Sequence, residues 1–219
     1  MWRNNSLSIV LFALFLFCLL GHAFAGWKAN NEERQEHGES AATFRQFVSS
    51  SEFGETVFEN WESEFLQMGF YVILTAVLLQ RGSSESKKGD GSDEVDEPPE
   101  AHRNDKDAPG PVRAGGWRLA LYKVSLSLAL FALFFISFFG HAIAGAQKFN
   151  QEQMQHGQTE HIGAFAYMAK AQFWYESFQN WQSEFLAVFS IVVLSIWLRQ
   201  YGSQESKPVH APHLETESS

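Results

Sequence analysis

The chain has 219 residues, of which 21 are phenylalanine and seven are tryptophan, and its formal net charge is −9. This acidic balance lacks the basic character typical of nucleic-acid-binding proteins, so we expect no nucleic-acid partner. The single cysteine, Cys18, excludes an intramolecular disulfide and a thiolate metal cluster within one chain.

The first predicted element is an apolar run from Leu7 to Ala25 that contains no Asp, Glu, Lys or Arg. Its length matches the roughly 20 residues that cross a hydrocarbon core about 30 Å thick. Arg3 before the run and Ala23-Phe24-Ala25 at its end are also typical of a cleaved signal peptide. The same ending recurs inside the chain as Ala142-Ile143-Ala144, which favours a retained helix.

The residues that follow this run are polar and include neither Pro nor a second Gly until His37-Gly38, which predicts a helix extended to His37 with a C′ glycine. Such a helix would be about 46 Å long, well beyond the hydrocarbon. Further on, Phe58, Trp61 and Phe65 share one helix face. We expect a short amphipathic helix on the outer membrane surface, followed by a helix that enters the bilayer. The alternative is a small ordered cap that packs on the extended first helix.

Three further apolar runs complete a prediction of four membrane spans. The run Val124 to Ala144 is as long as the first, whereas Phe65 to Leu79 and Phe185 to Leu198 are shorter. The shorter runs become long enough if the Trp and Arg residues that flank them lie at the membrane interfaces, where these residue types gather.

The second half of the chain repeats the first. At an offset of about 119 residues, Gly21 to Gly26 matches Gly140 to Gly145, including the histidine in each. One residue is then inserted, and Phe58 to Leu66 matches Phe178 to Leu186 in order. The polar positions match as well as the apolar ones, so the pattern indicates duplication of a two-span unit. Because each unit has two spans, the copies are predicted to be parallel repeats.

This repeat predicts four regions: a first two-span repeat over 1–81, a linker over 82–116, a second two-span repeat over 117–207 and a tail over 208–219. The linker and tail are rich in polar and acidic residues. Such segments bury too little apolar area to offset their ordering entropy, so we expect both to be disordered. The linker is then a tether, and a partner-binding acidic segment is the alternative.

The cationic residues predict the orientation. Five of the 16 Lys and Arg residues lie in the two loops between spans, and the other 11 lie in the N-terminal segment, the linker and the tail. The positive-inside rule therefore places both termini and the linker in the cytoplasm.

Eight polar residues at matching positions are the candidate functional cluster. They are His22, Glu64, His141, Glu184, Asn60, Asn180, His37 and His156. Polar groups within spans are costly and usually face protein or water, and His and Glu can bind zinc-like metals. One hypothesis is therefore a symmetric outer-leaflet site for a metal or a proton path. The other is that the histidines and glutamates hydrogen-bond each other or the loop backbone and orient the helices. No HExxH or CxxC motif supports a metal, so no cofactor is predicted.

The segment Asn60 to Met68, together with Asn30-Asn31-Glu32 and His37-Gly38 before it, resembles a family of bacterial membrane proteins catalogued only as a domain of unknown function. The resemblance covers both repeats. It implies a bacterial cytoplasmic-membrane setting and brings no known activity, cofactor or catalytic residue.

The sequence therefore predicts an all-α membrane protein with four transmembrane helices, arranged as two parallel-repeat hairpins with extended first helices and short amphipathic outer helices. The predicted partner is the lipid bilayer, with a homo-oligomer or another membrane protein as further possibilities. We expect a non-enzymatic structural or interaction role through the outer face. The alternatives are a small transporter or channel subunit and a metal-binding membrane enzyme.

Overall fold

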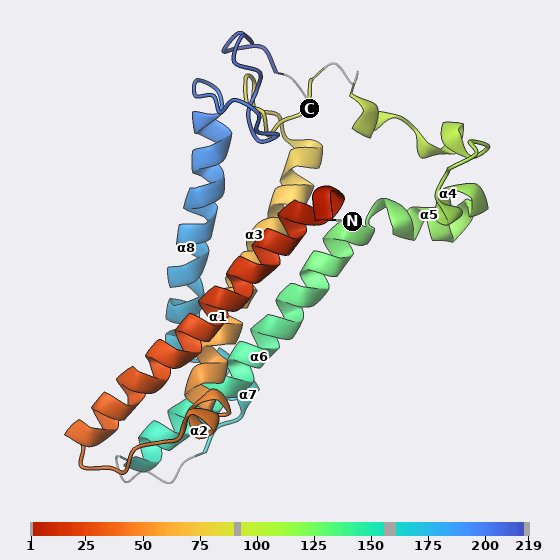
Figure 1. Cartoon of the computed structure of the whole chain (residues 1–219). Helices are drawn as coiled ribbons and strands as arrows, with labels where there is room; N and C mark the ends of the chain where they lie inside the picture. Colours follow the sequence, from red (N-terminus) through yellow and green to blue (C-terminus); the bar gives the residue numbers. More distant parts are fainter. Residues whose placement is uncertain (1, 90–92, 156–160, 217–219) are drawn as a thin grey trace. The chain divides into compact units, whose positions relative to one another are not determined.

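The computed structural model describes residues 2–89, 93–155 and 161–216, and its regular structure there is entirely helical (Figure 1). The helices of these residues are α1 Trp2–Glu36, α2 Phe44–Val48, α3 Ser51–Val77, η1 Glu94–Asp96, η2 Pro99–His102, α4 Gly110–Ala114, α5 Gly116–Lys123, α6 Ser125–Gln155, α7 Ala164–Met168 and α8 Ala171–Leu194. The all-α prediction is confirmed.

The chain divides into two compact units. Unit 1 consists of residues 1–58 and 139–173, and unit 2 consists of residues 59–138 and 174–219. Helices α3, α6 and α8 pass from one unit into the other. Unit 1 therefore contains the segments between the long helices, and unit 2 contains the linker and the tail.

Helix α1 ends as its sequence predicts. Gly38 adopts φ 72°, a left-handed conformation that a side chain would disfavour. This allows the Gly38 amide to donate to the Gln35 carbonyl at 3.0 Å and the Glu39 amide to donate to the Arg34 carbonyl at 2.8 Å. The two bonds form a Schellman motif that satisfies the last carbonyls of the helix.

Two helices, rather than the four predicted, are long and apolar enough by themselves to cross a membrane in the part of the chain that the structure describes. They are residues Asn4–Glu36 of α1 and Ser125–Gln155 of α6. In α3 the apolar run begins at Phe65 and the helix ends at Val77, which gives only about 20 Å of apolar helix. In α8 the corresponding stretch from Phe185 to Leu194 is shorter, because Ser195 to Trp197 form turns. Our prediction counted residues beyond these helix ends.

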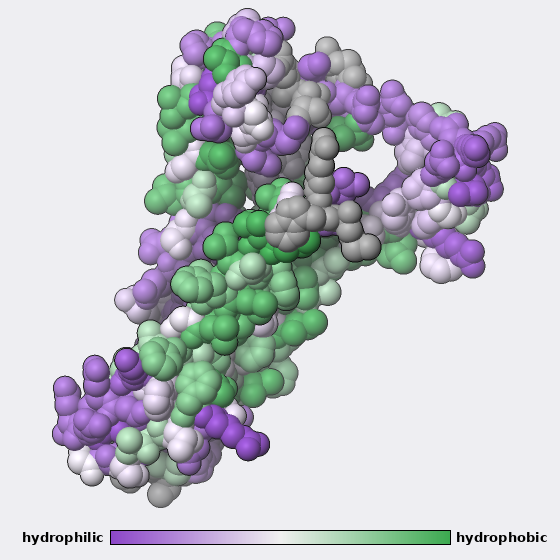
Figure 2. Space-filling model, in the orientation of Figure 1, coloured by the Kyte–Doolittle hydropathy of each residue, from purple (hydrophilic) through white to green (hydrophobic). Residues whose placement is uncertain are grey.

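The apolar side chains of α1 lie on the surface. Leu7 is 72% exposed and Phe17 is 74% exposed. Figure 2 shows apolar residues gathered over the visible face of α1 and hydrophilic residues at its C-terminal end. A surface of this kind is unusual for a helix that faces water.

The short helices after α1 and α6 form caps, the second of our two alternatives. In the first cap, the Trp27 indole donates to the Ala42 carbonyl at 2.7 Å, just before α2. A capping box between Thr43 and Gln46 begins α2. The ring of Phe47 then lies against Gly26, where an added Cβ would come within 2.9 Å of the ring. The cap is thus attached to α1 by both hydrogen bonds and packing.

The described part of the linker, which we expected to be disordered, contains η1, η2 and α4. Ala108 and Val112 of the linker form a small buried cluster with Leu119 of α5, which lies in the predicted second repeat. Residues 90–92 and 217–219, which belong to the expected disordered segments, lie outside the described residues. The disorder expected for 82–116 and 208–219 in solution stays a prediction.

Candidate functional site

The two histidines at matching positions each lie beside an aromatic ring in unit 1. The His22 ring is 5.2 Å from that of Phe53, and its Nε2 lies 3.4 Å from the Thr56 hydroxyl. The His141 ring stacks on Phe173 at 4.7 Å and is fully buried. Because Phe53 and Phe173 also occupy matching positions, the same histidine–aromatic contact occurs in both halves of the chain.

The other two predicted histidines are His37 and His156. His37 is exposed at the end of α1, where its Nδ1 lies 2.9 Å from the Glu33 carbonyl. Its position suits a helix cap. His156 lies outside the described residues.

Asparagine side chains hold the caps, and the sequence reasoning did not select them. The Asn31 amide accepts from the Ala42 backbone N–H at 2.7 Å and donates to the Ala42 carbonyl at 3.1 Å. Asn150 makes the same two bonds with Ile162, both at 2.9 Å. A side chain that pairs with both backbone groups of one residue fixes the loop against the helix. The matching of Asn31 with Asn150 was the sequence evidence that could have identified these residues.

The predicted residues Asn60, Glu64, Asn180 and Glu184 lie in unit 2, and Glu64 is exposed.

A different set of carboxylates contains two buried members, Glu55 and Glu62, and the half-buried Glu59. We name Glu55, Glu59 and Glu62 the carboxylate face of α3, since their i, i+4, i+7 spacing places them on one side of that helix.

Each member of the carboxylate face has a partner from the second half of the chain. In unit 1, Glu55 is 2% exposed and pairs with the Lys148 amine of α6 at 2.6 Å. In unit 2, the fully buried Glu62 accepts from the Trp181 indole of α8 at 3.1 Å, and Glu59 accepts from the Asn180 amide. Buried carboxylates require such partners, so this face joins the two halves of the sequence. Of the eight predicted residues, Asn180 contributes to it.

Glu52 lies in the first turn of α3, beside the first cap, and is half-buried. It accepts from the Asn30 amide at 2.8 Å. Burial raises its pKa, and the nearby charge of Glu33 raises it further. Asn30 and Glu52 line a polar pocket of about 290 Å³ together with Arg34, Gln46 and Gln151.

The segments that follow α3 and α8 form two matching turns in unit 2, with the motif Gln-x-Gly-Ser-x-Glu-Ser-Lys over 80–87 and 200–207. The glycines have φ 87° and 81°. In each turn the hydroxyl of the serine after the glycine accepts from the backbone N–H of the glutamate at 3.1 Å. The hydroxyl of the serine before the lysine accepts from the backbone N–H of the glutamine, at 2.8 Å in the first turn and 2.9 Å in the second. The motif therefore encodes one compact local structure twice.

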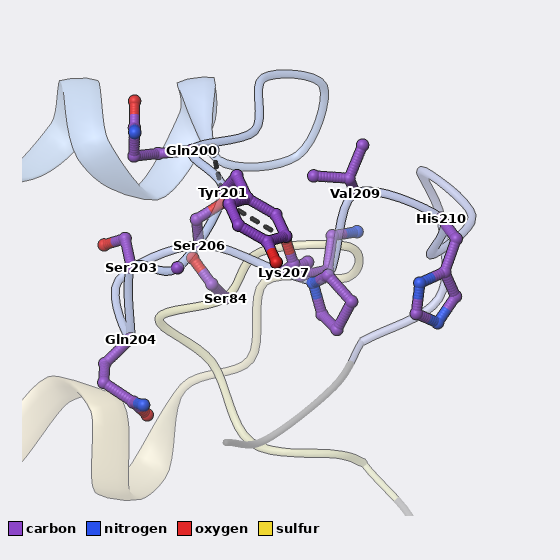
Figure 3. Close-up of a pocket in the computed structure, with 11 residues that line it drawn as sticks. Ser84, Gln200, Tyr201, Ser203, Gln204, Ser206, Lys207, Val209 and His210 are labelled. Atoms are coloured by element: carbon purple, nitrogen blue, oxygen red, sulfur yellow. Dashed lines mark hydrogen bonds between the residues drawn. The ribbon is translucent and has the colours of Figure 1, made fainter.

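The turn after α8 borders a pocket of about 500 Å³, which Figure 3 shows. Tyr201 and His210 line this pocket. The Lys207 amine does not serve as a ligand-binding group here, because it donates to the carbonyls of Pro212, His213 and Glu215 at 2.8 to 3.1 Å. Lys207 is 2% exposed and organises the tail.

The glutamates of the two turns interact. The Ser84 hydroxyl donates to the Glu205 backbone carbonyl at 3.0 Å and brings the turns together. The charge of Glu85 raises the pKa of Glu205, with burial as the second cause. Glu85 also accepts a hydrogen bond from the Tyr71 hydroxyl. Among the described residues, no three His, Cys, Asp or Glu side chains lie together in a group that could hold a metal ion.

Comparison with curated proteins and with solved structures found no match. The model of one protein family, described as a domain of unknown function (DUF6766), matches residues 1–218. This match covers both halves of the sequence, the linker and most of the tail, and the chain therefore belongs to the DUF6766 family.

Proposed function

We propose that this chain is an integral protein of the bacterial cytoplasmic membrane with a structural or interaction role rather than an enzymatic one. The observation that carries this proposal is the exposed apolar surface of α1. Side chains from Leu7 to Leu20 leave large hydrophobic groups on the surface, and Phe12 alone is 61% exposed. Contact with lipid removes this surface from water, which lowers the free energy by roughly 25 cal/mol for each Å² of apolar surface.

The proposed topology has α1 and α6 as the principal spans and α3 and α8 as their return helices. The short apolar stretches of α3 and α8 reach the opposite interface through the turns that follow them, with Arg81 and Arg199 at the headgroup level. Both termini and the linker are then cytoplasmic, in accordance with the distribution of Lys and Arg. Matched contacts such as Gly26 with Phe47 and Gly145 with Tyr167 support an origin by duplication.

The caps are the proposed interaction surface. The hydrogen bonds of Asn31 and Asn150 and the two histidine–aromatic contacts hold the caps against the long helices. Phe165, at the start of the second cap, is 80% exposed, and Phe44 in the first is 39% exposed. A rigid surface with exposed aromatic side chains is typical of protein-binding sites.

Membrane extraction and tag accessibility test the proposal. The full chain is expressed in bacteria, and washed membranes are treated with alkaline carbonate. We expect the chain to stay in the membrane pellet. Tags inserted after Glu97 and after Glu33 should then be accessible from the cytoplasm and from the outside, respectively. Release by carbonate, or accessibility of both tags from one side, would contradict the proposal.

A further inference from the structure

Helix α5 has two chemically different faces, and one of them packs on the linker. Leu119 is 4% exposed and lies in a cluster with Ala108 and Val112. One turn later, the Lys123 amine pairs with the Glu100 carboxylate at 2.7 Å. These contacts direct one side of α5 toward the linker.

The opposite face of α5 is apolar and exposed. Trp117 and Leu121 share this face through their i, i+4 spacing. Trp117 is 72% exposed and Leu121 is 51% exposed. The Arg118 guanidinium lies 5.7 Å from the centre of the Trp117 ring, at the edge of the same face. An exposed Trp beside an Arg is the combination that gathers at membrane interfaces.

The charge of this region is opposite to that of the whole chain. The segment from Gly110 to Lys123 contains Arg113, Arg118 and Lys123 and no Asp or Glu, whereas the chain has a net charge of −9. Arg113 and Arg118 are exposed. A local cationic surface beside exposed apolar groups suits an anionic lipid headgroup layer, which attracts each nearby Lys or Arg.

The position of α5 in the chain places it at a membrane interface if α6 is a span. Only Val124 separates α5 from α6 (Figure 1). The Val124 backbone, with φ −118° and ψ 8°, interrupts the helix there. The interruption allows α5 to leave the axis of α6 instead of extending it into water.

We propose that α5 is an interfacial anchor that lies on the cytoplasmic membrane surface and binds anionic lipid headgroups. This inference rests on the proposed function, because it needs α6 to cross the membrane. Trp117 and Leu121 enter the boundary between headgroups and acyl chains, and Arg118 and Arg113 bind lipid phosphates. Leu119 and Lys123 keep the linker attached to the anchored helix, so the linker is held at the membrane surface.

Site-directed spin labelling of the full chain in nanodiscs tests this proposal. A single cysteine is introduced by Leu121→Cys in a Cys18→Ser background. Val95→Cys in η1, at a residue that is 80% exposed, is the aqueous reference, and Leu128→Cys in α6 is the lipid reference. Collision rates with oxygen and with a water-soluble nickel complex are measured in discs of phosphatidylcholine alone and with phosphatidylglycerol.

We expect the label at position 121 to have an oxygen-to-nickel ratio above that of position 95, more so in anionic discs. Adding Arg118→Gln should reduce the surface-bound population in anionic discs by roughly fivefold and leave neutral discs unchanged. If position 128 contacts lipid while position 121 matches position 95, the anchor is overturned and the proposed function stands. If position 128 also matches position 95, the proposed function itself fails. Spin–spin broadening between chains in place of lipid contact would identify a second copy as the occupant and would also overturn the anchor.

Discussion

Small residues opposite aromatic rings determine how closely each cap approaches its long helix. At Gly26 an added Cβ would come within 2.9 Å of the Phe47 ring, and at Gly145 it would come within 2.9 Å of Tyr167 Cζ. Phe47 and Tyr167 are both buried. A side chain at either glycine therefore has to displace a ring that the surrounding cap holds in place.

We predict that Gly145→Ala lowers the free energy of unfolding by about 1–3 kcal/mol, because the new methyl group overpacks against Tyr167. The matched control is Gly21→Ala, which lies within α1 and meets nothing within 4 Å. This control should be neutral or stabilising by up to about 1 kcal/mol, since alanine favours helix. Thermal unfolding of both variants in one detergent measures the difference. Equal midpoints for the two variants would show that the Gly145 contact contributes nothing.

At the scale of the element, the two Gln-x-Gly-Ser-x-Glu-Ser-Lys turns show how one motif is completed by different surroundings. In the first, the Lys87 amine pairs with Asp96 of η1 at 2.6 Å. In the second, the Lys207 amine donates to three carbonyls of the tail. The local turn is the same, and the lysine binds whatever segment follows it.

We predict that Lys207→Met releases the tail, because three backbone carbonyls of the tail lose their donor. At about 1 kcal/mol net for each bond, the population of detached tail should rise at least tenfold. Limited proteolysis between Ala211 and Thr216 measures this population. Lys170→Met, far from the tail in sequence, is the control and should leave the cleavage rate of the tail unchanged.

The linker contains an element whose stability depends on pH. His102 of η2 lies 2.9 Å from Asp105 and 3.0 Å from Glu97. The hydrogen bond with Asp105, followed by that with Glu97, raises the pKa of His102 above its ordinary 6.5. The contribution of the charged histidine is thus complete below about pH 6.5 and is lost as the pH rises through the higher pKa of the folded linker.

This pH dependence predicts an NMR titration. The His102 ring carbons of labelled protein should titrate with a pKa above 6.5, and Asp105→Asn should return the pKa toward that value. An unchanged His102 pKa in Asp105→Asn would show that the ion pair is absent in solution.

At the scale of the whole molecule, the exposed apolar side chains of α1 distinguish lipid from water as the surroundings. Phe12 is 61% exposed, so its replacement by Arg would change stability little in a soluble protein. In a lipid-facing helix, the same change should cost about 2.5–3.5 kcal/mol. We therefore predict that Phe12→Arg reduces the membrane-integrated fraction more than tenfold. Glu36→Arg, at the polar end of α1, is the control. The integrated fraction is measured by carbonate extraction, and equal fractions for the two variants would contradict a lipid-facing α1.

Local interactions are what the amino-acid sequence determined by itself. The apolar runs of α1 and α6, the end of α1 at His37-Gly38 and the correspondence of the two halves all follow from residue order and periodicity. Helix type and length depend on spacing and on end residues, which are local. The same reasoning overestimated the lengths of α3 and α8. Hydropathy does not reveal where these helices end, because the apolar residues continue past Val77 and Leu194 and the first glycine comes several residues later.

Only the tertiary structure decided which polar residues matter. Glu62 and Glu64 are two residues apart and have the same side chain, yet Glu62 is fully buried against Trp181 and Glu64 is exposed. Asn31 and Asn150 match in the sequence, but the structure was needed to show that each pairs with the backbone of a residue 11 or 12 positions away. The physical reason is that burial of a carboxylate or an amide depends on partners that other helices supply, and residue order does not specify them.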